Sequence, residues 1–256
     1  MRYLNCNLSG KYATKSSLPL SLRPRRISKM ASSYAVSIIE LSLASKKPIL
    51  QFGSFTLKSG RQSPYFFNFG LFDSGPLLLT LSEAFADAII SAYPSIGLDS
   101  ADEKTPTVLF GPAYKGIPLV ATIATELARR GRSIGFSYNR KEAKTHGEGG
   151  SIVGASLQNA VVLIIDDVIT AGTAIRQAYE IVKACGGVVG GIVEALDREE
   201  RGNGTMSTVQ EVEEELKVKV TSVVKMRDIV AWLKSQGRDL EMANMEEYRK
   251  QYGIQN

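Results

Sequence analysis

The sequence predicts an α/β fold with a mainly parallel sheet and helices on both of its faces. Between residues 108 and 224, short apolar segments typical of buried strands alternate with longer amphipathic segments typical of helices. The apolar run Val161–Ile165 has no polar face, as expected of a central parallel strand that is covered on both sides. Polar clusters follow several of these strands, and ligands of such sheets bind outside the carboxyl ends of the strands.

The N-terminal part predicts two helices and a group of short strands. The first helix is expected to begin with Ser33 as its cap and to end before Pro48. Residues 51–72 contain aromatic segments separated by glycine and proline, which predicts short antiparallel strands and turns. A second helix is expected over Leu77–Tyr93, followed by an acidic surface loop over residues 97–106.

The rest of the chain predicts the alternating elements of the parallel sheet. Pro118 favours the start of a helix that ends near Gly131, and residues 141–151 are expected to form a charged, glycine-bearing loop. The expected strands are Val108–Phe110, Ser133–Asn139, Val161–Ile165, Val188–Ala195 and Val218–Val224. The expected further helices are Thr173–Cys185, Val209–Leu216, Met226–Ser235 and Leu240–Tyr252.

Composition limits the classes of function. The net charge of +5 arises in residues 1–30, which hold seven basic residues and no acid, so residues 31–256 carry a small negative charge. We therefore expect no nucleic-acid partner. Without a run of about 18 apolar residues, we also expect no membrane span. With two cysteines in 256 residues, neither a structural disulfide nor a thiolate zinc site is expected.

The basic leader, residues 1–30, has two interpretations. Its serine-rich, acid-free composition is that of an organellar transit peptide. Alternatively, it is an unstructured extension, or Met30 is the working start. We expect the leader to be disordered, residues 31–256 to form one domain, and the protein to be cytoplasmic, with the organellar alternative open.

The strongest functional signal is the run VVLIIDDVITAGTA at residues 161–174. A buried strand delivers Asp166 and Asp167 to its carboxyl end, where carboxylates can accept hydrogen bonds from ribose hydroxyls or hold Mg²⁺ through water. The loop Thr170–Thr173 offers backbone N–H groups at a helix N-terminus, which favours a phosphate. By itself, a pair of acids at a strand end also fits a simple acidic pocket.

A second signal is the segment RKEAKTHGEGG at residues 140–150, which is rich in basic residues and glycine. It is either a solvated surface loop or a mobile cationic lid. Such a lid would stabilise the negative charge that develops on a departing anion, and would exclude water while closed.

Three further segments carry polar groups beside predicted strands. The turn FGPAYKGIP at residues 110–118 contains Lys115 and can bind an anion through backbone N–H groups. In residues 55–68, Lys58 and the pair Phe66 and Phe67 could wall a flat heterocycle, although such rings are often simple core packing. Arg198, just after a strand end, could bind a planar carboxylate through two parallel hydrogen bonds.

Together, these five segments resemble the orotate phosphoribosyltransferases, type I phosphoribosyltransferases, in the family's order over roughly residues 34–252. The lid and the LKSGRQSPYFF segment distinguish orotate enzymes from purine enzymes of the superfamily. The resemblance implies a five-stranded parallel core (about residues 104–225) and a small N-terminal hood (mainly residues 48–75). It also implies a monofunctional homodimer whose lid loops are shared across the interface.

The implied reaction is transfer of the phosphoribosyl group of 5-phosphoribosyl 1-diphosphate (PRPP) to orotate, a pentosyl transfer in UMP biosynthesis. The cofactor would be Mg²⁺, held mainly by PRPP and water rather than directly by the protein. The implied catalytic residues are Arg140, Lys144, His146, Asp166 and Asp167. The implied PRPP-binding residues are Lys58, Tyr114, Lys115, Arg140, Lys141, Lys144, His146, Asp166, Asp167, Val168, Ile169, Thr170, Ala171, Gly172, Thr173 and Ala174. Orotate would contact Phe66, Phe67, Thr170 and Arg198.

Two alternatives stay open at this stage. The first is a phosphoribosyltransferase for a purine base. The second is a non-catalytic PRPP sensor that binds protein or nucleic acid, for which the sequence offers no added DNA-binding module.

Overall fold

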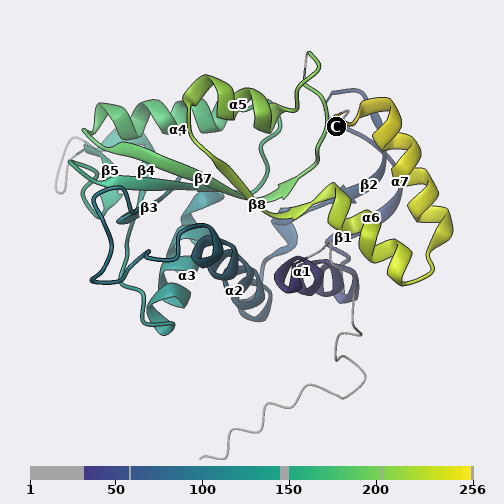
Figure 1. Ribbon diagram of the computed structural model, residues 1–256, viewed down its shortest axis with the longest axis horizontal. Coiled ribbons are helices and arrows are strands. Elements are labelled where there is room, and N and C mark those ends of the chain that lie inside the picture. The colour runs from purple at the N-terminus through teal and green to yellow at the C-terminus, as the bar shows by residue number, and fades with distance from the viewer. Residues whose placement is uncertain (1–31, 58, 145–149, 203, 255–256) are drawn as a thin grey trace, which may run out of the picture.

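The computed structural model describes residues 32–57, 59–144, 150–202 and 204–254. Its main sheet has six strands in the order β5-β4-β3-β6-β7-β8 (Figure 1). Five of them are parallel: β4 (Gly135–Lys144), β3 (Val108–Gly111), β6 (Val161–Asp166), β7 (Val188–Asp197) and β8 (Val220–Lys225). The predicted fold class and five-stranded parallel core are confirmed, with one antiparallel edge strand, β5 (Gly150–Gly154), added.

Helices cover both faces of this sheet. On one face lie α4 (Thr173–Ala184) and α5 (Thr208–Leu216). On the other lie α1 (Ser33–Ala44), α2 (Gly75–Ala92) and α3 (Gly116–Arg129). The last two helices, α6 (Met226–Ser235) and α7 (Asp239–Tyr252), pack on each other beside a separate two-stranded sheet (Figure 1).

That small sheet pairs β1 (Leu50–Thr56) with β2 (Gln62–Phe67) in antiparallel register, as predicted for residues 51–72. A short 3-10 helix, η2 (Phe69–Leu71), follows β2. The small sheet contacts both α1 and α7. It therefore brings an N-terminal segment against the end of the chain.

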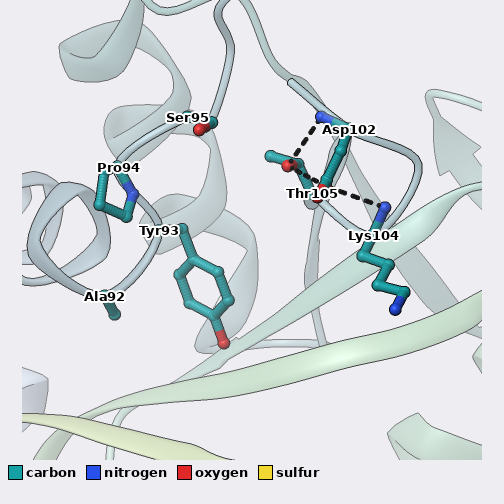
Figure 2. A pocket seen from close by; sticks show the side chains of 7 residues that line it. All are labelled: Ala92, Tyr93, Pro94, Ser95, Asp102, Lys104 and Thr105. Atoms are coloured by element: carbon teal, nitrogen blue, oxygen red, sulfur yellow. Dashed lines mark hydrogen bonds between the residues drawn. The ribbon is translucent and has the colours of Figure 1, made fainter. Parts of the chain in front are cut away.

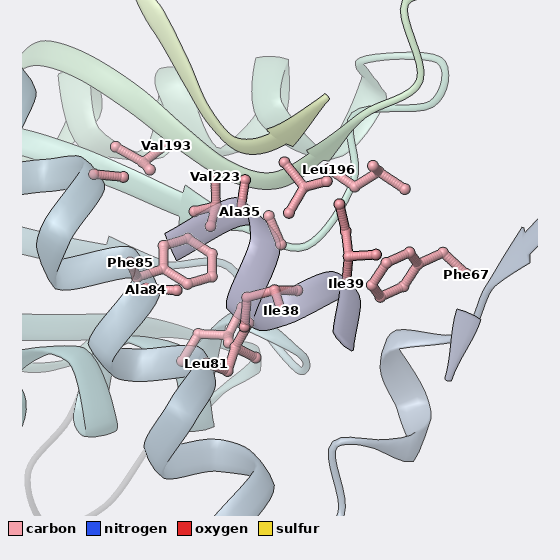
Figure 3. Packing of buried hydrophobic residues seen from close by; sticks show 14 of the residues in the cluster. Ala35, Ile38, Ile39, Phe67, Leu81, Ala84, Phe85, Val193, Leu196 and Val223 are labelled. Atoms are coloured by element: carbon pink, nitrogen blue, oxygen red, sulfur yellow. The ribbon is translucent and has the colours of Figure 1, made fainter. Parts of the chain in front are cut away.

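The hydrophobic core has two parts, one on each face of the main sheet. Along β6, Leu163 and Ile165 belong to the cluster that α1, α2 and α3 cover, whereas Val162 and Ile164 belong to the cluster that α4 and α5 cover. Figure 3 shows the first cluster, where Phe85 of α2 packs near Val223 of β8. Because successive side chains of a strand point to opposite faces, and both faces of β6 are covered, its positions from Val161 to Ile165 must be apolar.

Helix α2 is, by length and composition alone, apolar enough to cross a membrane. Its apolar side chains include Leu81 and Phe85, which are fully buried in the core. Its two acids, Glu83 and Asp87, pair with Arg129 and Arg130 at the end of α3. Packing inside the domain therefore accounts for its apolar character.

Two local predictions were wrong. Ser32, not Ser33, caps α1, since its Oγ accepts the N–H of Ala35 at 3.4 Å. Residues 141–151 are not simply a loop: β4 continues to Lys144 and β5 begins at Gly150. Strand pairing of Tyr138 with Val153 and of Asn139 with Ile152 makes this segment a hairpin, which the charged residues concealed.

Candidate active site

Two adjacent carboxylates end the central strand β6. Asp166 is its last residue and is buried, whereas Asp167 is partly exposed. The N–H of Asp167 donates to Oδ1 of Asp166 at 2.9 Å. Lys115, from the turn after β3, places its Nζ 2.5 Å from Oδ2 of Asp167. The pair is thus held at the strand end with one carboxylate already facing a cation.

The buried environment changes the acidity of this pair. Burial raises the pKa of Asp166 to about 6, and the neighbouring charge of Asp167 acts in the same direction. Any donor or cation that binds the two carboxylates relieves this unfavourable charge. A pair of ribose hydroxyls and Mg²⁺ are both suitable partners.

The loop after the acids leads directly into α4. Gly172 precedes the helix with φ +74°, a left-handed conformation that glycine adopts without strain. Within the described residues, no protein acceptor takes a hydrogen bond from the N–H of Thr170, Ala171 or Gly172. Free backbone donors at a helix N-terminus form a binding site for a phosphate group.

Two side chains hold this loop in place. Glu194 of β7 is fully buried and accepts the N–H of Ile169 through Oε2 at 2.9 Å. Its Oε1 accepts the hydroxyl of Ser222 of β8 at 3.1 Å. Arg176 of α4 donates from Nη1 to the carbonyl of Ala171 at 2.9 Å. The loop backbone is therefore fixed at two points.

The turn after β3 is unusually tight. A Cβ atom on Gly111 would lie 2.3 Å from the carbonyl oxygen of Gly116, so both positions need glycine. The Ala113–Tyr114 peptide is cis, and the N–H of Ala113 donates to Oδ1 of Asn139 at 2.9 Å. The turn leaves Tyr114 66% exposed at the same end of the sheet as the acid pair.

Strand β4 carries the first residues of the predicted lid. Nζ of Lys141 lies 4.7 Å from the ring centroid of Tyr114, a cation–π contact. Arg140 precedes it on β4, and Lys144 is the last residue of that strand. His146, like Lys58, lies outside the described residues. The base of the predicted lid is thus connected to the turn after β3.

Arg198 lies just past the end of β7, where its neighbours hold it firmly. Its side chain is 14% exposed. Nε donates to Oε1 of Glu200 at 2.7 Å, and Nη2 donates to Oγ of Ser63 at 3.0 Å. The guanidinium carbon lies 4.3 Å from the ring centroid of buried Tyr65. These contacts connect the end of β7 to β2.

Glu200 is shared by several groups. Besides Arg198, it accepts the hydroxyl of Tyr248 of α7 at 2.9 Å and lies 3.5 Å from Nη1 of Arg61. Two guanidinium groups therefore face one carboxylate. The surplus positive charge of this cluster suits a planar carboxylate ligand.

The rings of Phe66 and Phe67 lie on opposite faces of β2, because side chains alternate along a strand. Phe67 is 7% exposed and stacks on Phe69 in the core, with ring centroids 4.6 Å apart. Phe66 is 38% exposed and stacks on Phe55 at 5.7 Å. The ring of Phe66 is thus available to a flat ligand, whereas that of Phe67 is taken up by core packing.

The side chains of Val168 and Ile169 also point into the protein, where they pack against the two core clusters. Thr170, Ala171, Thr173 and Ala174 are exposed. A phosphate at this loop would therefore meet the backbone and the hydroxyls of Thr170 and Thr173.

The sequence analysis missed the residues that support the site rather than line it. Asn139, Ser222 and Glu200 carried no signal by themselves. Glu194 did carry one, because it is an acid inside the otherwise apolar run Ile192–Leu196 of a central strand. A carboxyl group is buried in such a place only with hydrogen-bonding partners.

Two surface depressions lie at the opposite end of the sheet. One, of about 240 Å³, is lined by Tyr93, Asp102, Lys104 and their neighbours (Figure 2). The other, of about 270 Å³, is lined by residues 154–158 with Ile152 and Cys185. Both lie where the chain enters strands, and neither includes a predicted site residue.

Comparison with known proteins identifies relatives across most of the chain. The phosphoribosyl transferase domain family matches residues 80–225. The orotate phosphoribosyltransferase of Marinobacter nauticus is 50% identical over 222 residues, which cover 86% of this chain and 99% of the relative. That of Acinetobacter baumannii is 47% identical over 219 residues, covering 85% and 95%. The crystal structure of the Francisella tularensis orotate phosphoribosyltransferase has a TM-score of 0.72 at 38% identity, covering 84% of this chain and 98% of that one.

The raised pKa of Asp166 generates a stability prediction. An acid whose pKa is higher in the folded chain than in the unfolded chain destabilises the fold increasingly as pH rises from about 4 through about 6. Asp166→Asn keeps the Oδ1 acceptor for Asp167 but removes this charge. We expect the variant to gain roughly 1–3 kcal/mol over the wild type at pH 8 and much less at pH 4, measured by urea unfolding.

The exposed Asp73 supplies the control for this experiment. Asp73→Asn should change the stability by a similar small amount at both pH values. An Asp166→Asn variant whose advantage does not grow with pH would show that the buried charge carries no such cost.

Proposed function

Because the chain belongs to the orotate phosphoribosyltransferase family, it transfers the 5-phosphoribosyl group from PRPP to orotate, and we propose that it does so at the carboxyl end of its parallel sheet. The products are orotidine 5′-monophosphate and pyrophosphate, in pyrimidine biosynthesis. The observation that carries the proposed site is the contact of Lys115 with Asp167, beside a loop in which three successive N–H groups have no acceptor among the described residues.

We assign the sugar and its 5′-phosphate to the end of β6. The carboxylates of Asp166 and Asp167 accept the ribose hydroxyls, and the backbone of Thr170–Thr173 holds the 5′-phosphate at the N-terminus of α4. The hydroxyls of Thr170 and Thr173 add donors. Direct transfer to the base needs no covalent intermediate with the enzyme, so these residues orient the substrate rather than attack it.

We assign the diphosphate to the turn after β3 and to the lid. Lys115 contacts Asp167, and Lys141 contacts the ring of Tyr114. Arg140, Lys144 and His146 belong to the same basic segment, and Lys58 would add a further cation. As the bond to the anomeric carbon breaks, negative charge grows on the pyrophosphate, and these donors stabilise it.

We assign the carboxylate of orotate to Arg198. Its planar fork matches a carboxylate, and the cluster around Glu200 has one guanidinium more than it has carboxylates. The ring of Phe66 and the backbone of Phe67 would flank the base, with Thr170 close by.

The donor set fits Mg²⁺ that is held mainly by substrate. Among the described residues, no group of three or more histidine, cysteine or acidic side chains could form a protein cage for a metal ion. Asp166 and Asp167 offer two carboxylates beside the expected diphosphate, and Mg²⁺ typically binds one or two carboxylates together with substrate phosphates and water. When bound, the ion would neutralise charge on the diphosphate.

We also propose a homodimer in which each lid serves the neighbouring site. Strands β5 and β4 form one edge of the main sheet, so a hairpin built on them is open to a second copy of the chain. We place the enzyme in the cytoplasm and treat residues 1–30 as a leader, 48–75 as the hood and 104–225 as the core. A native N-terminus well inside the leader would instead favour an organelle.

The direct test of this function is consumption of orotate by the full chain in the presence of PRPP. We expect turnover with Mg²⁺, loss of turnover when a chelator removes the ion, and recovery when Mg²⁺ is restored. Adenine and hypoxanthine are the control bases. Turnover of either base without turnover of orotate would contradict the assignment.

Lys144→Ala tests the lid. Removing a donor that acts only as charge develops should lower kcat by about 100-fold or more and affect the KM for orotate little. Lys183→Ala, on the exposed face of α4, is the control and should leave kcat unchanged. An unaltered kcat in Lys144→Ala would remove this residue from the mechanism.

Mixing two impaired variants tests whether lids are shared. Lys144→Ala has a damaged lid, and Asp167→Asn has a damaged acid pair. If the lid acts across the interface, the mixed dimer has one intact site and regains activity. A mixture that forms mixed dimers but stays inactive would place each lid over its own site.

Arg198→Ala tests the orotate assignment. Charge-assisted hydrogen bonds contribute roughly 1.5–3 kcal/mol each, so the KM for orotate should rise at least tenfold while that for PRPP changes little. Arg198→Lys keeps the charge without the fork and should be intermediate. Arg238→Ala, at a guanidinium that stacks on Phe52, is the control. A defect confined to PRPP binding would contradict the assignment.

A further inference from the structure

We propose that Glu194 is a positioning residue for the 5′-phosphate: by accepting the N–H of Ile169, it fixes the loop so that the next three N–H groups face the ligand. This inference rests on the proposed binding of the 5′-phosphate by the loop Thr170–Thr173. Glu194 itself touches no substrate in this proposal.

The register of the sheet places Glu194 directly beneath the site. On β7 it is paired with Asp166 of β6 on one side and with Ser222 of β8 on the other. Its carboxyl group is fully buried, and each oxygen has one partner: Oε2 the N–H of Ile169 and Oε1 the hydroxyl of Ser222. Glu194 thus lies between Asp166 and Ser222 on the neighbouring strands, and its carboxyl group reaches the loop after β6.

A carboxyl group at this position is costly for a structural role alone. Ile192, two residues earlier on the same face of β7, is a core residue, and an apolar side chain at position 194 would make no hydrogen-bonding demand. Burial raises the pKa of Glu194 well above its ordinary value, and the charges of Asp197 and Asp166 act in the same direction. What the carboxyl group adds is an acceptor for one loop amide.

That amide belongs to a buried residue directly before the exposed Thr170. The side chain of Ile169 is buried in the core, and its N–H points inward to Glu194. The N–H groups of Thr170, Ala171 and Gly172, in contrast, meet no acceptor within the described chain. One fixed inward amide followed by three free amides is the arrangement that preorganises an anion site, because fewer loop conformations must be lost on binding.

The test compares inhibition by two fragments of PRPP. Ribose 5-phosphate carries the 5′-phosphate, whereas pyrophosphate carries only the leaving group. Glu194→Met keeps the length of the side chain but removes the carboxyl acceptor. We expect its inhibition constant for ribose 5-phosphate to rise about tenfold or more, and that for pyrophosphate to change less than about twofold.

Two further variants separate positioning from general damage. Glu194→Gln keeps an oxygen for Ile169 and should restore inhibition by ribose 5-phosphate to within about threefold of the wild type. Ser222→Ala disturbs the same buried network without touching the loop, so it should lower the melting temperature but leave both inhibition constants in place. Equal weakening of both fragments by Glu194→Met, or no weakening of either, would overturn the proposal.

Hydrogen exchange of the wild-type chain tests the same point without a substitution. The Ile169 amide should exchange much more slowly than those of Thr170, Ala171 and Gly172, and these three should slow when ribose 5-phosphate is added. A fast Ile169 amide would overturn the role of Glu194 alone. Failure of ribose 5-phosphate to inhibit the wild type, or to slow the three outer amides, would overturn the proposed phosphate site and this inference together.

Discussion

The burial of β6 on both faces is the constraint on which the site depends. Four consecutive side chains, Val162 to Ile165, alternate between the two halves of the core. A shift of the pairing register by one residue would move each of them to the opposite face of the sheet. Asp166 and Asp167 are therefore held at a fixed place at the carboxyl end of the sheet. The loop and α4 begin from that same point, which keeps the acid pair and the loop Thr170–Thr173 at a constant spacing.

The remaining parts of the site are connected to this end of the sheet through individual contacts. Lys115 reaches Asp167 from the turn after β3, and Lys141 reaches Tyr114 from β4. On the other side, Arg198 connects β7 to β2 through Ser63, and Tyr248 of α7 reaches the same cluster through Glu200. Segments far apart in the sequence are thus coupled at one end of the sheet. In the proposed assignment, rigid groups bind the sugar and basic segments bind the anion that leaves.

Much of this arrangement could be predicted from the sequence, for physical reasons. The strand positions follow from apolar runs, and α6 was predicted with its observed bounds because its apolar positions recur at helical spacing up to the glycine that follows. The VVLIIDDVITAGTA run combined a buried strand, paired acids and a helix start, and the structure brings those features together. Relatives named as orotate phosphoribosyltransferases confirm the function that this run and the other segments indicated.

The features that escaped prediction depend on contacts between distant segments. The β4–β5 hairpin was concealed because charged residues in an edge strand give no alternating apolar pattern. Glu194 and Ser222 meet through a pairing of β7 with β8 that only the sheet register defines. The sequence predicted that Phe66 and Phe67 together could flank a flat ligand. Because side chains alternate along a strand, the ring of Phe67 instead packs in the core.

A crystal structure of the chain with PRPP would test the central claim most directly. The account predicts the 5′-phosphate on the N–H groups of Thr170, Ala171 and Gly172, the ribose hydroxyls on Asp166 and Asp167, and the diphosphate toward Lys115. A ligand bound in the reverse direction, or at the opposite end of the sheet near Tyr93 and Lys104, would contradict it.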